Sequence, residues 1–133
     1  MIEGRQAQVL IDEEFRAAAP LLELPGLTWF AVYCQQDPGS AFWDPDENDT
    51  LDDLEDTLLE LCQEFGHGWA VYVCRLATRG IREYYVYHGQ GAELEKVLPI
   101  LREAYPAYRL EYDVTSDPKW KRYASLLSAL DGA

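Results

Sequence analysis

The spacing of apolar side chains along the chain predicts four helices. The clearest is residues 50–65, where leucines recur every three or four positions and carboxylates occupy the opposite side. Pro99 lies inside another of the four, so we expect that helix to be kinked or short. The predicted helices cover residues 7–19, 50–65, 92–104 and 117–130.

Four other segments are rich in aromatic and β-branched residues, which is typical of strands. Residues 107–115 alternate most regularly, with apolar side chains on one face and charged ones on the other. Thr78-Arg79-Gly80 separates two of the segments and predicts a hairpin, because Gly80 can adopt a positive φ. The predicted strands cover residues 27–35, 69–77, 81–88 and 107–115.

The resulting order, β-α-β-β-α-β, is typical of the ferredoxin-like split βαβ fold in the α+β class. Right-handed crossovers would place both middle helices on one face of a four-stranded antiparallel sheet. We expect a single domain over residues 1–133, with a core at 27–115 and added helices at 7–19 and 117–130. The other face of the sheet would stay open unless a terminal helix, a protein partner or a second copy covers it.

Composition supports a folded chain and gives no sign of secretion. Hydrophobic residues make up 48% of the 133 residues, which is enough to form a core. No segment approaches the roughly 20 apolar residues of a membrane span or carries the apolar block of a signal peptide. Cys34, Cys62 and Cys74 lie far apart, so we expect reduced thiols in a cytoplasmic protein. Ile2 to Arg5 spell an engineered protease site or a native sequence, and we leave them out of the fold prediction.

Charge is strongly acidic and unevenly distributed. The net charge is −13, and residues 17–74 contain 12 acidic side chains but no Lys or Arg. Such a field repels nucleic-acid phosphates and anionic membranes, and it attracts basic surfaces or cations. We therefore expect a protein partner with a basic surface, and no binding to nucleic acid or membranes.

The acidic loop before the helix at 50–65 is a weak calcium candidate. Its residues approach the spacing of an EF-hand loop, whose oxygen ligands suit Ca²⁺. However, Asp49 replaces the usual glycine and no helix precedes the loop, so a capped helix start is the alternative. The candidate calcium ligands are Asp44, Asp46, Asn48, Asp52 and Glu55.

Aromatic residues on the predicted strands form a second candidate site. Tyr85 and Tyr87 share one strand face, as do Trp29 and Tyr33 on another strand, and they could bind a partner or pack under a terminal helix. Arg82 and His88 on the same strand as Tyr85 and Tyr87 complete a possible ligand site or interface. For Arg82 we expect a carboxylate partner on the last strand, at Glu111 or Asp113.

Motifs for catalysis are scarce. The chain has two histidines, and no nucleophile elbow, P-loop or dinucleotide-binding motif is present, which favours a non-enzymatic protein without a cofactor. Lys119, Lys121 and Arg122 place positive charge at the start of the last helix, against the helix dipole. We expect these three to pair with the acidic surface of the chain itself.

The second half of the chain resembles a known family. It resembles the bacterial family catalogued as domain of unknown function 695, and its ending is also similar to the B-type regulator of ribonuclease E activity, a small acidic protein that binds and inhibits that enzyme. The resemblance covers roughly residues 69–127; it implies a ferredoxin-like fold and brings no established catalytic residues. The motifs are Gly80-x-Arg82-x-x-Tyr85-x-Tyr87, Tyr105-Pro106-x-Tyr108 and Asp117-Pro118-x-Trp120-x-x-Tyr123. Turn, capping and packing roles explain most of these residues.

Three hypotheses for function follow. The leading one is a cytoplasmic, non-enzymatic binding or regulatory module that engages a basic partner through the acidic surface. The second is a small-molecule binder or enzyme with a pocket near Arg82 and His88, and the third is a calcium-responsive module; a homodimer is compatible with all three. The expected partner-binding residues are Trp43, Asp44, Asp46, Asp49, Asp52, Asp53 and Asp56.

Overall fold

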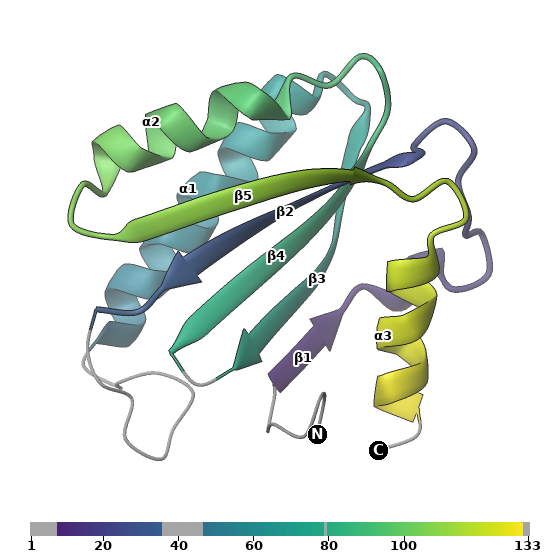
Figure 1. Cartoon of the computed structure of the whole chain (residues 1–133), viewed down its shortest axis with the longest axis horizontal. Coiled ribbons are helices and arrows are strands. Elements are labelled where there is room, and N and C mark those ends of the chain that lie inside the picture. Colours follow the sequence, from purple (N-terminus) through teal and green to yellow (C-terminus); the bar gives the residue numbers. More distant parts are fainter. Residues whose placement is uncertain (1–7, 36–46, 79, 132–133) are drawn as a thin grey trace.

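A computed structural model describes residues 8–35, 47–78 and 80–131 of the chain. These residues form a mixed α+β fold, in which an open five-stranded antiparallel sheet carries three α-helices (Figure 1). The strands are β1 (Gln8–Ile11), β2 (Gly26–Tyr33), β3 (Ala70–Thr78), β4 (Ile81–His88) and β5 (Arg109–Ser116). The α-helices are α1 (Asn48–Gly66), α2 (Val97–Ala104) and α3 (Lys121–Asp131). None of the helices described is long and apolar enough to cross a membrane.

The sheet has the strand order β1-β3-β4-β2-β5, and every neighbouring pair is antiparallel. Consequently β2 and β3 run parallel to each other with β4 between them, and β4 and β5 run parallel with β2 between them. The hairpin predicted around Gly80 is confirmed: β3 and β4 flank the turn, and Gly80 has a φ of 81°. Helix α1 begins and ends within two residues of the predicted helix, and it stops at His67, which has a φ of 51°.

The predicted helix at residues 7–19 is wrong, and its place is taken by a fifth strand. Residues 8–11 form β1, which pairs with β3 from Gln8↔Ala77 to Ile11↔Cys74, and a short 3₁₀ turn follows. Its apolar spacing fits a helix equally well, but the free edge of β3 supplies backbone hydrogen bonds to an extended chain. Asp12 ends the strand by accepting a hydrogen bond from the amide of Glu14 at 3.0 Å.

Two other helices are shorter than the sequence predicts. A 3₁₀ turn at Leu94–Lys96 precedes α2, and Pro99 lies in the first turn of α2. Pro99 is tolerated there because the first N–H groups of a helix lack an intrahelical acceptor in any case. Helix α3 starts at Lys121 instead of residue 117, because residues 117–120 form a turn in which Trp120 has a φ of 53°.

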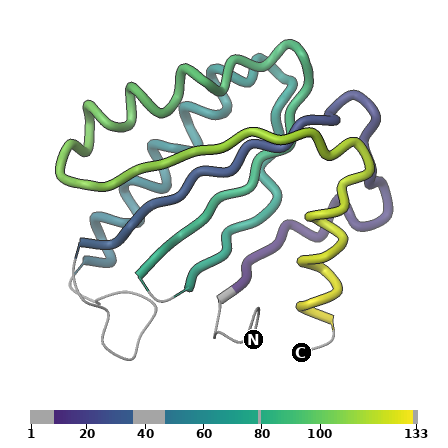
Figure 2. Tube along the Cα trace, in the orientation of Figure 1, coloured from purple at the N-terminus to yellow at the C-terminus, as the bar shows by residue number. Residues whose placement is uncertain are grey.

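Buried side chains form one core on each face of the sheet. The first core lies between the sheet and helices α1 and α2; Phe30, Tyr84 and Leu54 belong to it. The second core lies between the other face of the sheet on one side and α3 with the N-terminal segment, residues 9–24, on the other. Tyr85, Tyr87 and Trp120 belong to it. Helix α3 therefore covers part of the sheet face opposite α1 and α2, which is one of the three alternatives predicted for that face, and the chain trace places β1 beside α3 (Figure 2).

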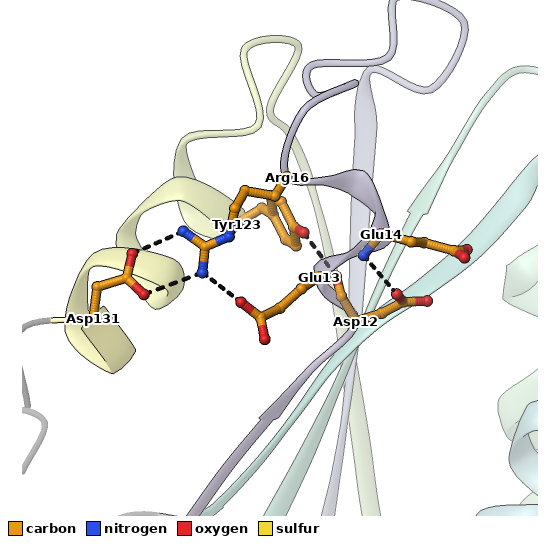
Figure 3. Close-up of polar contacts among 6 residues, drawn as sticks. All are labelled: Asp12, Glu13, Glu14, Arg16, Tyr123 and Asp131. Atoms are coloured by element: carbon orange, nitrogen blue, oxygen red, sulfur yellow. Dashed lines mark hydrogen bonds and ion pairs between the residues drawn. The ribbon is translucent and has the colours of Figure 1, made fainter.

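The N-terminal segment is tied to α3 by polar contacts as well (Figure 3). The hydroxyl of Tyr123, which is buried, donates to the carbonyl of Asp12 at 2.7 Å. Arg16 pairs with Asp131 at 2.8 Å and with Glu13 at 2.5 Å. These two ion pairs are exposed and contribute little, so the buried contacts of Tyr123 hold the segment in place.

Candidate functional site

The exposed side of α1 carries a row of carboxylates, which we call the acidic stripe. Its five residues are spaced by three or four positions, so they lie along one side of the helix over about 22 Å. All five are exposed, and α1 contains no Lys or Arg. The acidic stripe consists of Asp49, Asp53, Asp56, Glu60 and Glu64.

The acidic stripe works against the stability of its own helix. Asp49 and Asp53, Asp56 and Glu60, and Glu60 and Glu64 are like charges four residues apart, which repel each other. In addition, Glu60 and Glu64 lie near the C-terminus of α1, where the helix dipole disfavours negative charge. Features that oppose local stability are expected at functional sites more than elsewhere.

Two of the predicted partner-binding residues also contact the chain itself. The Asp53 carboxylate accepts a hydrogen bond from the Tyr105 hydroxyl at 2.5 Å. Asp52 accepts one from the Asn48 amide at 3.2 Å and lies 3.7 Å from the Arg82 guanidinium. Asp49 and Asp56 are exposed on the acidic stripe, whereas the predicted Trp43, Asp44 and Asp46 lie outside the described residues.

Arg82 lies under α1 and not beside the last strand. Its side chain is 1% exposed, and its guanidinium lies 4.0 Å from the carboxylate of Glu55, which also pairs with Arg75 at 2.8 Å. The expected partners Glu111 and Asp113 are therefore wrong. Strand β2 separates β4 from β5, and residue 82 faces α1, whereas residues 111 and 113 face the other side.

The calcium prediction is only partly covered by the structure. Asn48, Asp52 and Glu55 belong to α1, and the Glu55 carboxylate is engaged by Arg75 and Arg82. The described residues contain no group of three or more carboxylate, histidine or cysteine side chains that could hold a metal ion. Since Asp44 and Asp46 lie outside the described residues, calcium binding stays a prediction.

A buried carboxylate that sequence analysis missed lies at the start of α1. Glu47 is almost fully buried and accepts hydrogen bonds from the Tyr108 hydroxyl at 2.5 Å and the Gln35 amide at 2.9 Å. Burial, reinforced by the neighbouring Glu47 carboxylate, raises the pKa of Tyr108. In the sequence, the Tyr105-Pro106-x-Tyr108 motif is the feature that could have indicated this contact. Its last tyrosine connects the loop after α2 to the start of α1 through the hydrogen bond to Glu47.

A groove of about 530 Å³ lies on the opposite face of the sheet, beside the start of α3. We call it the α3 groove. Trp29 and Tyr85 are directly opposed in the register of β2 and β4, and with Leu27 they supply apolar side chains to the lining. The remaining lining residues are Glu83, Thr115, Ser116, Asp117, Lys121, Arg122 and Ser125.

Positive side chains stand at the α3 end of the groove. Arg122 donates from Nη2 to the Tyr85 hydroxyl at 3.0 Å, and its Cζ lies 5.2 Å from the centre of the Tyr85 ring. Neither Lys119 nor Lys121 forms an ion pair with a carboxylate of the described residues. The expectation that these lysines pair with the acidic surface is therefore wrong. Their chain segment lies on the sheet face opposite α1, which carries seven carboxylate side chains and no Lys or Arg.

The Asp117-Pro118-x-Trp120-x-x-Tyr123 motif fastens α3 to the sheet. The two oxygens of Asp117 accept from the amides of Lys121 at 2.9 Å and Arg122 at 3.0 Å, and Oδ2 also accepts from the Tyr87 hydroxyl at 2.6 Å. The same hydroxyl accepts from the amide of Tyr123 at 3.2 Å. These bonds occupy N–H groups that the start of a helix leaves unsatisfied. Tyr87 therefore has a structural role.

The four residues predicted as one ligand site do not come together. Arg82 and His88 lie six residues apart on β4, or about 20 Å, and both face α1 and α2. Tyr85 and Tyr87 face α3, and only Tyr85 lines the α3 groove. The ring of His88 occupies the space that a side chain at Gly26 would need, and burial lowers the pKa of His88.

We expect Asp117 to make folding stability depend on pH. Burial by itself would raise its pKa, but the hydrogen bonds from Tyr87 and from two amides outweigh it and hold the pKa below the ordinary value. The ionised carboxylate thus stabilises the fold above about pH 4, and this contribution is lost as the pH falls through the lowered pKa. At pH 7, Asp117→Asn is expected to lower the free energy of unfolding by about 1.5–3 kcal/mol in urea titrations.

The difference between the wild type and Asp117→Asn is expected to shrink as the pH falls below about 4 and through the lowered pKa of Asp117, because the wild-type carboxylate then becomes neutral as well. Two parallel stability profiles would contradict this role of the charge.

Comparison with known proteins identifies the family. No curated protein and no solved structure matches the chain, so these comparisons do not show the similarity to the B-type regulator of ribonuclease E activity. The sequence model described as "Family of unknown function (DUF695)" matches residues 1–128. The match includes the acidic first half, which the resemblance over residues 69–127 did not reach. The chain therefore belongs to the DUF695 family.

Proposed function

We propose that the protein is a non-enzymatic binding or regulatory module, and that the acidic stripe of α1 engages a basic surface of a protein partner. The observation that carries the proposal is the row of five exposed carboxylates on a helix without a single Lys or Arg. A basic partner would offset the repulsion among these carboxylates. The free energy that the repulsion costs the free helix would then favour binding.

The fold supports a binding role for this surface. We propose that β2, α1, β3, β4, α2 and β5 form a ferredoxin-like unit, because each βαβ connection joins two parallel strands that are separated by one strand of the other connection. In this arrangement α1 packs its leucines on the sheet and presents its other side outward. A rigid helix that is anchored along its length holds the five carboxylates in fixed positions.

The two histidines support the non-enzymatic part of the proposal. His67 is exposed in the turn after α1, where it lies 2.7 Å from a carboxylate oxygen of Glu93. His88 is partly buried over Gly26 at the end of β4. The similarity of the C-terminal motif to an acidic regulator that binds an enzyme also agrees with a regulatory role.

The test compares two triple variants that lose the same amount of charge. Asp56→Asn/Glu60→Gln/Glu64→Gln removes carboxylates from the acidic stripe that make no hydrogen bond or ion pair within the described residues. The control, Glu14→Gln/Glu95→Gln/Glu103→Gln, removes three exposed carboxylates elsewhere. Each bait is incubated with a lysate of the source organism at low and at high salt, and the retained proteins are quantified by mass spectrometry.

We expect a basic protein that the wild type and the control retain at low salt, and that the stripe variant retains at least tenfold less. High salt should weaken its retention by the wild type, because exposed charges are screened. Equal retention by both variants, or retention that does not change with salt, would contradict the proposal. Circular dichroism confirms that each bait is folded.

A further inference from the structure

We propose that the α3 groove binds a small planar organic anion, whose flat part lies on Trp29 and whose acidic group is held by Lys121 and Arg122. The groove lies on the sheet face opposite α1, so this inference is independent of the role of the acidic stripe. Two observations carry it, namely the aromatic lining and the position of the cations, and the hydrogen bonds at the start of α3 leave recognition of the anion to side chains.

The size and lining of the groove suit a small ring compound. Its volume of about 530 Å³ lies in the range of roughly 300–1,000 Å³ that is typical of ligand sites. Tyr85 is 3% exposed and packed, whereas Trp29 opposite it is only partly buried and lines the groove. An indole ring at the side of a groove binds planar ligands by offset stacking. Strands on both sides hold Trp29 in place.

Within the described residues, the two lysines at the start of α3 have no ion pair that would account for their position. Lys119, Lys121 and Arg122 gather three positive charges at the N-terminus of a helix, where the dipole disfavours them, in a chain with a net charge of −13. Lys121 lines the groove without an ion pair to a described carboxylate. Arg122 is positioned by its hydrogen bond to Tyr85, so its guanidinium stands next to the aromatic side chains of the groove. An anionic group between them would be attracted by both.

Carboxylates of the groove define where the acidic group of the ligand can lie. Both oxygens of Asp117 are occupied by amides and by the Tyr87 hydroxyl. Glu83 lies two residues before Tyr85 on β4, about 7 Å further along the strand. Repulsion from Glu83 disfavours an anionic group at that end of the groove. Asp117 is negative too, but its charge is offset by three hydrogen-bond donors, so the anionic group is placed beside Lys121 and Arg122 and the apolar part toward Trp29.

Side chains and not the helix end would recognise the anion. The amides of Lys121, Arg122 and Tyr123 already donate to Asp117 and Tyr87, so the usual anion site at a helix N-terminus is occupied by the protein itself. Hydroxyl groups of Thr115, Ser116 and Ser125 complete the lining and can hydrogen-bond polar substituents.

The test uses a pair of probes that differ in charge. The full chain is titrated with 8-anilinonaphthalene-1-sulfonate, and in parallel with N-phenyl-1-naphthylamine, which has the same rings without the sulfonate. Binding is followed by probe fluorescence and by the loss of tryptophan emission. Lys121→Gln is compared with Lys119→Gln, its neighbour that does not line the groove. A second variant, Trp29→Leu, tests the aromatic contact.

We expect the sulfonate probe to bind with a stoichiometry of one, and Lys121→Gln to weaken it at least fivefold while Lys119→Gln weakens it less than twofold. The neutral probe should change less than twofold in both lysine variants, and Trp29→Leu should weaken both probes. The stripe variant Asp56→Asn/Glu60→Gln/Glu64→Gln should bind the sulfonate probe like the wild type.

Equal weakening by the two lysine variants would overturn the site, because it would show a diffuse surface attraction. Failure of the sulfonate probe to bind would overturn it too, as would a groove closed by a second copy, which sedimentation at the titration concentration reveals. A cooperative thermal transition of each variant excludes binding to partly unfolded protein as the source of the signal.

Discussion

Replacing Trp120 by alanine is expected to lower the free energy of unfolding by about 3–5 kcal/mol, which is a large part of the stability of a typical small protein. Trp120 is 1% exposed and stacks on Tyr87, with ring centres 4.0 Å apart and an interplanar angle of 10°. Its Nε1 donates to the carbonyl of Leu24 at 3.0 Å, and its ring contacts those of Tyr123 and Phe15. The substitution would therefore leave a cavity between α3, the sheet and the N-terminal segment.

Urea denaturation measures this loss, and a second tryptophan serves as control. Trp69 is 46% exposed, so Trp69→Ala should lose no more than about half as much. Trp120→Phe keeps a ring for the stack but removes the hydrogen bond to Leu24, and an intermediate loss of about 1–2 kcal/mol is expected. Similar losses in Trp120→Ala and Trp69→Ala would show that α3 is not fastened by this residue.

The role of Trp120 also changes the interpretation of the family motif. Asp117, Trp120 and Tyr123 are used to cap α3 and to hold it on the sheet, and they leave no chemical group for a substrate. A relative with this motif is expected to share the packing of α3, whatever it binds. Specific function is then expected in residues outside the motif, such as the acidic stripe or the rim of the α3 groove.

Elements held by local interactions could be predicted from the sequence. Helix α1 has a long leucine period, and the β3–β4 hairpin has a glycine at its turn, so neighbouring residues suffice to define both. Strand β1 could not be predicted in this way. It has four residues, and it is extended because β3, more than sixty residues away, offers a free edge. The hydrophobic spacing of such a short segment fits either a strand or a helix.

To predict which side chains contact each other, the order of the strands in the sheet must be known, and the sequence does not reveal this order. Alternation along β4 correctly separates Tyr85 and Tyr87 from Tyr84, but it does not tell which helix covers each face. The sequence therefore favours acids on the last strand as partners of Arg82, whereas in the structure Asp52 and Glu55 of α1 lie near it. A buried arginine on a strand whose neighbours are apolar favours a partner on the covering helix.

The sequence shows several residues of the α3 groove but does not show that they lie close together. The sequence contains the aromatic residues Trp29 and Tyr85, and it places the positive charge of Lys121 at the start of a predicted helix, where the dipole disfavours it. Their meeting depends on β2 and β4 being neighbours and on α3 crossing the same face, and both are long-range features. By contrast, Arg82 and His88 lie near Tyr85 in sequence but on the other face of the sheet.

The second large effect is expected at Glu55, whose carboxylate lies close to the buried Arg82 and pairs with the partly buried Arg75. It pairs with Arg75 at 2.8 Å and lies 4.0 Å from Arg82, and the side chains of Arg75 and Arg82 are 11% and 1% exposed. Two positive charges under α1 would lose this counter-ion in Glu55→Ala. Removal of one partner from a buried ion pair costs about 3–5 kcal/mol, because the remaining charge stays in a poorly solvated place.

Asp52 provides a matched control for Glu55 on the same helix. It also faces Arg82, at 3.7 Å, but its side chain is 55% exposed, so Asp52→Ala should cost less than about 1 kcal/mol. If the loss at Glu55 arises from the missing negative charge, the double variant Glu55→Leu/Arg75→Met should be more stable than Glu55→Ala, because the second substitution removes the cation that pairs most closely with Glu55. Urea denaturation of the four proteins decides between the explanations. Equal losses of unfolding free energy in Asp52→Ala and Glu55→Ala would contradict the buried ion pair as the source of the effect. A double variant less stable than Glu55→Ala would show that packing of the Arg75 side chain, and not its charge, holds α1 on the sheet.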